Sequence, residues 1–253
     1  MTDLTLSLIA AGCIVAGVLA GVWLQVLLPA HHLSERSQDT VKLGAGVIAT
    51  MSALVLGLLV SSAKNSYDVA SANVAQIGAK FIALDELLTQ YGPETQPLRV
   101  QLKTALAERI DSMWRPRVDT SAGLRSLEGT RITANLQKRL SELAPSNAEQ
   151  KLLVTELWQI SADIRQSRLL LIEQQQSGLP PILLWLLVFW LTLLFVSFGL
   201  FAPRNVTVIV VLLVCALSVS SAIFLILEMN HPLEGVIKVS SAPLLKALEL
   251  IGR

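Results

Sequence analysis

The chain has 253 residues, of which 53% are hydrophobic and 15% are charged. Soluble domains carry about 25% charged residues, so this composition argues against a soluble cytosolic enzyme, a disordered tail and a fibrous repeat. The net charge of +1 gives no reason to expect nucleic acid as a partner, and two cysteines cannot form a disulfide framework.

Uncharged stretches long enough to cross a membrane occur at 4–28, 43–63, 174–203 and 205–227. A hydrocarbon core of about 30 Å takes about 20 helical residues. Because the bilayer offers no hydrogen-bond partners, such stretches must be helices or strands of a closed barrel. Unbroken apolar runs such as 182–196 favour helices. The first stretch is expected to be retained, since its apolar run is longer than that of a signal peptide and no Lys or Arg precedes it.

An even number of crossings places both termini on the same side as the segment 64–178. That side carries 17 of the 20 Lys and Arg residues, and the positive-inside rule therefore predicts that it is the cytoplasm. The sequence predicts an all-α integral membrane protein with four transmembrane helices and a helical cytoplasmic bundle between spans two and three. The expected domains are 1–63 (spans one and two, with a short outer loop at 29–42), 64–178 (the cytoplasmic bundle), 179–227 (spans three and four) and 228–253 (a cytoplasmic tail).

The predicted bundle holds 27 of the 39 charged residues, and its apolar residues recur at the 3–4 spacing of packed helices. One apolar stripe runs over 74–91 and a second over 153–171. Because no Pro or Gly cluster precedes the first stripe, one continuous helix is expected over about 43–91. Further helices are expected over about 97–114, 121–143 and 146–178. Ser146 followed by Glu149 is typical of a capping box that starts the last of them.

The sequence contains none of the motifs GxxxxGK[ST], GxGxxG, HExxH and GxSxG. No enzyme activity, catalytic site, cofactor or metal is therefore expected. His31 and His32 lie in the outer loop with acids nearby. One interpretation is a metal-binding or proton-sensing role, and the other is an ordinary interfacial loop. The ordinary loop is preferred, because adjacent histidines on a helix point about 100° apart. Cys13 and Cys215 lie inside spans, where a packing role is preferred.

Span two has a face of small side chains that continues into a basic residue. Its members, at helical spacing, are Gly46, Thr50, Ala53, Gly57 and Ser61, and Lys64 and Asp68 extend the face toward the predicted cytoplasm. Small residues let helix backbones approach closely, so one interpretation is a helix-packing seam, as for Gly17-x-x-x-Gly21 in span one. The other is a pore lining, in which small side chains leave room and Lys64 sets a positive field at one mouth. Spacing alone favours packing, and both interpretations stay open.

Span four ends in the run Glu-Met-Asn-His-Pro at 228–232. Glu228 is an acid at or just past the membrane edge, and its simplest role is to mark the interface. The alternative is an ion-pair or gating contact with a basic residue such as Lys64 or Lys238. His231 lies three residues further on and is included in the same candidate gating or interface site.

Several motifs resemble the bacterial bestrophin-like domain family. The matching pieces are the run from Gly46 to Gly57, Ser61 to Lys64 with Tyr67, Gln76 to Gly78, Arg165-x-x-Arg168, Leu179-Pro180 before Leu184-Trp185, and a tail from Glu228 to Gly235 with Ser240, Ser241 and Pro243-Leu244. Together they span almost the whole chain. The sequence departs from the family pattern at Leu58 and Leu233, where the family usually has aromatic residues, and at 113–116, where it commonly has Glu-Trp-Pro.

The resemblance implies the architecture of bestrophins, which are oligomeric anion channels with four transmembrane helices and a helical cytoplasmic domain. Together with the four predicted spans and the Lys and Arg distribution, it predicts a multi-pass protein of the bacterial inner membrane, in contact with the lipid bilayer, with both termini cytoplasmic. It further implies a homo-oligomer, guessed to be a pentamer, that passes anions with span two near the pore axis. The bestrophin-like family itself has no settled activity to transfer. The alternative function is a membrane-anchored helical scaffold or sensor whose cytoplasmic bundle binds a protein partner.

Overall fold

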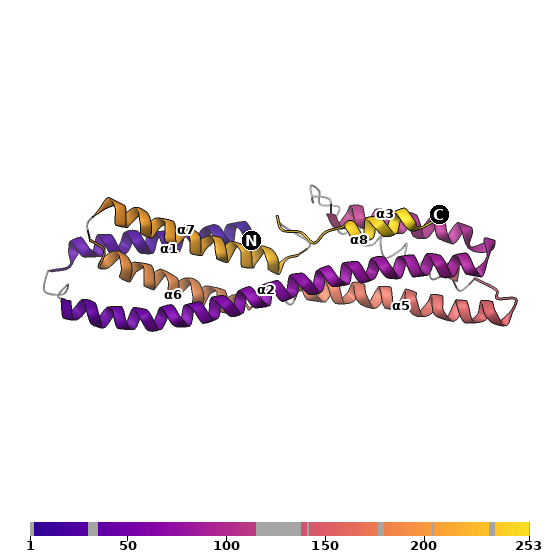
Figure 1. Cartoon of the computed structure of the whole chain (residues 1–253), viewed down its shortest axis with the longest axis horizontal. Coiled ribbons are helices and arrows are strands. Elements are labelled where there is room, and N and C mark those ends of the chain that lie inside the picture. Colours follow the sequence, from indigo (N-terminus) through magenta and orange to yellow (C-terminus); the bar gives the residue numbers. More distant parts are fainter. Residues whose placement is uncertain are drawn as a thin grey trace. The chain divides into compact units, whose positions relative to one another are not determined.

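The computed structural model describes residues 3–29, 35–114, 138–140, 142–176, 180–203, 205–232 and 236–252. Within these ranges the regular structure is helical, as the sequence predicts, and no strand occurs. The helices, shown in Figure 1, are α1 (Asp3–Leu27), α2 (Glu35–Tyr91), the 3-10 turn η2 (Pro93–Thr95), α3 (Gln96–Trp114), α5 (Ala148–Gln176), α6 (Pro181–Leu200), α7 (Val206–Asn230) and α8 (Ala242–Leu250). The outer-loop histidines and most of the helix expected over 121–143 lie outside the described residues.

Within the described part of the chain, four helices are long and apolar enough to cross a membrane. Their stretches are Leu4–Leu27, Ser37–Tyr91, Pro181–Leu200 and Val206–Asn230. The second lies in α2, whose 57 residues extend over about 86 Å at 1.5 Å per residue. Its uncharged part ends at Ala63, so the turns beyond Lys64 lie outside the predicted span. The expectation of one continuous helix from span two to Tyr91 is confirmed.

The chain divides into two compact units. The first comprises Met1–Tyr67 and Gly178–Ile237, and the second comprises Asp68–Ser177 and Lys238–Arg253. The first therefore holds α1, α6, α7 and the early turns of α2, while the second holds the later turns of α2 with α3, α5 and α8. The second unit contains most of the segment predicted to be cytoplasmic, and its side of the membrane stays a prediction.

Glycines bring the backbones of α1 and α6 into direct contact in the first unit. A Cβ atom added to Gly21 would overlap the carbonyl oxygen of Val196 and would lie 2.8 Å from the Leu200 nitrogen. A Cβ atom on Gly17 would lie 2.9 Å from the carbonyl oxygen of Thr192. No side chain larger than hydrogen fits at these separations. The glycine pattern of span one is therefore a packing seam, as predicted.

In the second unit, the later turns of α2 pack with α3, α5 and α8 around buried leucines. These include Leu84, Leu88, Leu102, Leu106, Leu157 and Leu244. Tyr91 ends α2, and Gly92 follows with a φ of 136°, a conformation that favours glycine. The Thr95 hydroxyl lies within hydrogen-bonding distance of the Leu88 and Gly92 carbonyls and closes the turn into α3. The end of this helix at about residue 91, expected from the sequence, is confirmed.

The cap of α5 differs from the prediction by one residue. The helix begins at Ala148, so the capping position is Asn147 rather than Ser146. The Gln150 amide donates to Asn147 Oδ1 at 2.7 Å, and Gln150 Oε1 accepts from the Ser146 amide at 2.9 Å. A cap side chain bonds the amide three residues further on, which is residue 150 when residue 147 is the cap. The predicted pairing of Ser146 with Glu149 is therefore wrong.

Candidate functional site

The small-residue face predicted for span two lies on α2 and is not covered by any other part of the chain that the structure describes. All of its members are exposed: Gly46, Thr50, Ala53, Gly57, Ser61 and Lys64. A Cβ atom added to Gly46 or Gly57 would meet no other atom within 4 Å. Thr50 Oγ1 donates to the Val47 carbonyl at 2.8 Å, so its hydroxyl is satisfied within the helix. Among the described residues this face therefore has no packing partner, in contrast to Gly17 and Gly21 of α1.

A different face of α2 packs into the core of the first unit. It carries the buried residues Ala45, Ser52, Leu59 and Ala63, which recur at seven- and four-residue intervals. The Ser52 hydroxyl is buried and has no hydrogen-bond partner among the described residues. Because α2 is covered on one side only, its small-residue face is available to a neighbouring copy, to lipid or to water.

Lys64 is the basic end of this face and lies beside an aromatic ring. Its Nζ atom is 5.9 Å from the centroid of the Tyr67 ring, near the outer limit of about 6 Å for a cation–π contact. Lys64 is exposed and Tyr67 is half-buried. The ammonium group therefore stays accessible at the end of the stripe.

Glu228 is a buried acid in the last turn of α7, with 4% of its surface exposed. Its Oε2 atom accepts hydrogen bonds from the amides of Val236 at 2.6 Å and Ile237 at 3.2 Å. The His231 amide donates to the Glu228 carbonyl at 3.3 Å, and the His231 side chain is half-buried. The carboxylate thus fixes the chain where it turns away from α7. An ion pair of Glu228 with a lysine stays a prediction.

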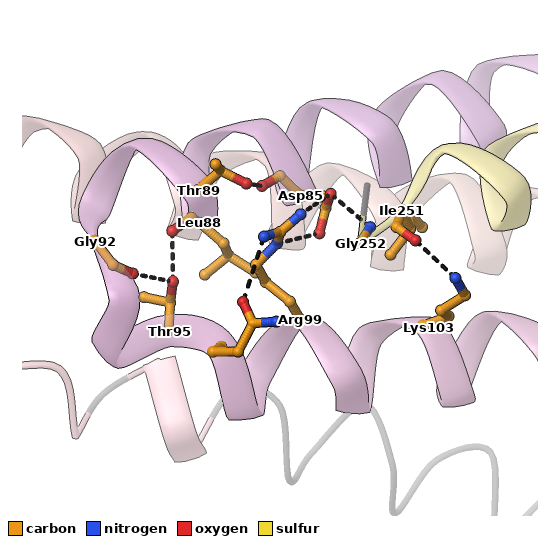
Figure 2. Close-up of polar contacts among 10 residues, drawn as sticks. Asp85, Leu88, Thr89, Gly92, Thr95, Arg99, Lys103, Ile251 and Gly252 are labelled. Carbon is orange, nitrogen blue, oxygen red and sulfur yellow. Dashed lines mark hydrogen bonds and ion pairs between the residues drawn. The ribbon is translucent and has the colours of Figure 1, made fainter.

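An ion pair between α2 and α3, shown in Figure 2, was not predicted from the sequence. Arg99 Nε donates to Asp85 Oδ1 at 2.8 Å, and Arg99 Nη2 donates to Asp85 Oδ2 at 2.9 Å. The side chains are 11% and 9% exposed, respectively. Such a bidentate pair is strong and geometrically specific. It fixes the second unit at the turn between these helices.

The chemistry of the pair agrees with its geometry. Burial alone would raise the pKa of Asp85, but hydrogen bonds from Arg99 and the Gly252 amide and the charges of Arg99 and Lys103 outweigh it, so this pKa lies below its ordinary value. The hydrogen bond to Asp85 raises the pKa of Arg99. Both groups are therefore charged at neutral pH.

Among the described residues, no group of three or more His, Cys, Asp and Glu side chains lies close enough to hold a metal ion. The residues of the two predicted sites lie on α2 and at the end of α7. The structure gives each of them a position, and their functional roles stay predictions.

Four apolar helices of membrane-spanning length, together with a second helical unit, define a multi-span membrane protein of the all-α class. A family model described as Bestrophin-like domain matches residues 12–244, and the chain therefore belongs to the Bestrophin-like family. The resemblance seen in the sequence motifs is confirmed. Comparison with curated proteins and with solved structures gives no match.

Proposed function

We propose that the protein is an oligomeric anion channel in which α2 helices from several copies surround the pore axis. The observation that carries this proposal is the uncovered small-residue face of α2. Gly17 and Gly21 of α1 pack against α6 within the chain, whereas Gly46 and Gly57 have no described neighbour within 4 Å of an added Cβ atom. Membership of the Bestrophin-like family supports the same function.

The residues on this face favour anions over cations. The face carries no acid from Gly46 to Ser61, the exposed Asp68 extends it one turn beyond Lys64, and its first charged group is the Lys64 ammonium group. A ring of such groups, one from each copy, would attract anions, because rings of Lys or Arg select anions in other pores. Small side chains at the axis leave room for the permeating ion.

The proposal includes a homo-oligomer, for which a pentamer is the family-based expectation, and an orientation with the second unit in the cytoplasm. The orientation rests on the 17 of 20 Lys and Arg residues predicted on that side. The competing function is a scaffold whose spans only anchor and oligomerise the protein. It predicts the same oligomer without ion flux.

A single substitution separates a pore from a packing seam between copies. Lysine in place of Ala53 would meet water in a pore, so it should alter anion selectivity while the oligomer survives. In a dry seam the same lysine would be buried without a partner, which costs several kcal/mol and would break assembly. The matched control is Met51→Lys, because Met51 is exposed but lies about 160° around the helix from Ala53 and about 100° from Thr50. The control should leave selectivity unchanged.

The measurement is anion flux into liposomes, made alongside the oligomer mass in nanodiscs. Gly57→Leu should block flux by filling the axis, whereas Leu59→Ile on the buried face should conserve it. Intact oligomers with near-zero flux in both the wild type and Ala53→Lys would refute the pore and leave the scaffold.

A further inference from the structure

The small-residue face of α2 continues toward the start of the helix into a pair of opposite charges. Lys42 Nζ lies 3.7 Å from Asp39 Oδ1, and the two side chains are 62% and 76% exposed, respectively. At 100° per residue, Asp39 lies about 20° around the helix from Gly46. Lys42 lies about 40° from Gly46 and about 20° from Ala53. Both charged residues therefore belong to the face that carries the proposed pore lining.

The uncharged part of this face has a lysine at each end. The chain contains no charged residue between Lys42 and Lys64, and both lysines are exposed on α2. Their separation along the helix is about 33 Å at 1.5 Å per residue, which matches a hydrocarbon core of about 30 Å. In the predicted span, the two ammonium groups therefore lie at opposite edges of the membrane, where each can meet water.

The pair at this end of α2 acts mainly on the electric field beside the helix. Its contribution to stability is small, because an exposed ion pair gains little over contacts with water. A lysine alone presents a positive charge to a passing ion, whereas a lysine beside a carboxylate presents a dipole, whose field falls off faster with distance. Asp39 therefore weakens the attraction of Lys42 for an anion.

We propose that Lys42 is a second residue that selects anions, at the opposite end of the face from Lys64, and that Asp39 limits this selection. The inference rests on the proposed function, in which several copies of the face surround one axis. Each copy then contributes one Lys42 and one Asp39 to the entrance, so that the site is complete only in the oligomer. The ligand class is a small inorganic anion such as chloride.

The test measures the ratio of chloride to potassium permeability for the full-length protein. The reversal potential in a planar bilayer under a KCl gradient gives this ratio. A unit charge about 6 Å away changes the concentration of an ion about threefold in water. At an ionic strength of about 0.15 M, Lys42→Gln should therefore lower the ratio and Asp39→Asn should raise it, each by about threefold. Both changes should shrink at about 1 M salt, because the screening length falls from about 8 Å to about 3 Å.

Two controls separate the charge on the face from other effects of substitution. Lys42→Arg conserves the charge and should keep the wild-type ratio. The matched control for position is Thr40→Lys, because Thr40 is exposed at the same end of α2 but lies about 120° around the helix from Gly46. This lysine adds a charge away from the face and should leave the ratio unchanged.

Chemical modification tests the charge after the protein has assembled. The variant is Lys42→Cys, with both native cysteines replaced by serine. A thiol reagent that carries a quaternary ammonium group should restore the wild-type ratio, whereas one that carries a sulfonate group should lower the ratio further. Equal ratios after the two reagents would contradict the role of a charge at this position.

The outcomes distinguish this inference from the channel proposal. Currents with equal permeability ratios in the wild type, Lys42→Gln and Asp39→Asn would overturn the role of the pair and leave the channel intact. Absence of current from the wild type would overturn the channel and, with it, the selection of anions by Lys42. Ratios that change in the expected directions and shrink at high salt would support both.

Discussion

Replacement of Gly21 by alanine should loosen the contact between α1 and α6. The added methyl group would overlap the Val196 carbonyl oxygen and would lie 2.8 Å from the Leu200 nitrogen and 2.9 Å from the Gly199 Cα atom. All three obstacles are backbone atoms of α6, so no side-chain rotation relieves the overlap. Because protein interiors are close-packed, they hold no free space for the added methyl group, and the two helices must move apart by about 1 Å.

The size of the effect follows from two opposing contributions. Overpacking costs about 1–3 kcal/mol, and the backbone obstacles at Gly21 place this substitution at the upper end. Alanine regains about 1 kcal/mol over glycine in a helix interior. A net loss of about 2 kcal/mol corresponds to a decrease in Tm of about 4–8 °C for a chain of this size.

The assay is thermal unfolding of the purified protein in detergent, followed by circular dichroism. The matched control is Gly12→Ala on the same helix, where an added Cβ atom meets no atom within 4 Å. The control should keep or raise the Tm, because it gains helix propensity without an overlap. Equal Tm values for Gly21→Ala and Gly12→Ala would refute the close approach of α1 and α6.

Three further predictions concern orientation, pH and the end of α7. A cysteine at Ser126, with both native cysteines replaced by serine, should resist impermeant thiol reagents on intact cells; efficient labelling would place residues 64–178 outside. Because the folded-state pKa of Asp85 is lowered, its stabilising contribution is complete above the unfolded pKa of about 3.9 and is lost as pH falls through the folded value. The stability gap between wild type and Asp85→Asn should therefore be full at pH 7 and 5 and should shrink below about pH 3.9, as measured by chemical denaturation; a pH-independent gap would contradict this. Glu228→Ala should speed hydrogen exchange of the amides at 236 and 237, with Glu228→Gln intermediate because it keeps an acceptor, and unchanged exchange would contradict the cap.

The membrane-spanning helices were predictable because one strong constraint acts on them. A helix in a bilayer needs about 20 uncharged residues, and this requirement is visible without knowledge of any tertiary contact. The break at Gly92 was also visible, since glycine followed by proline ends a helix by local sterics. The cap of α5 was misplaced by one residue, because Ser146 and Asn147 are both good caps and only the first helical residue decides between them.

The ion pair of Asp85 with Arg99 could not be assigned from the sequence, because the second unit is rich in charges and each has many candidate partners. One signal was present: Asp85 follows Leu84 and Arg99 follows Leu98, and both leucines are buried. A charged residue next to a buried one lies at the edge of the seam between two consecutive helices. Charges in this position on both helices can therefore meet each other. The docking of Gly252 has no such local signal, because 167 residues separate it from Asp85.

The same kind of pattern, small residues at three- and four-residue spacing, has different outcomes on α1 and α2. A seam requires that both helices present small residues at the same level, and Gly199 of α6 does this for Gly21 of α1. For Gly57 of α2, no atom of another described element lies within 4 Å of an added Cβ atom. In the proposed oligomer, this face would meet the same residue types of other copies at a shared axis, with Lys64 forming a ring. Under that proposal, the pore and the packing interpretations of α2 share one oligomer and differ in whether water fills its centre.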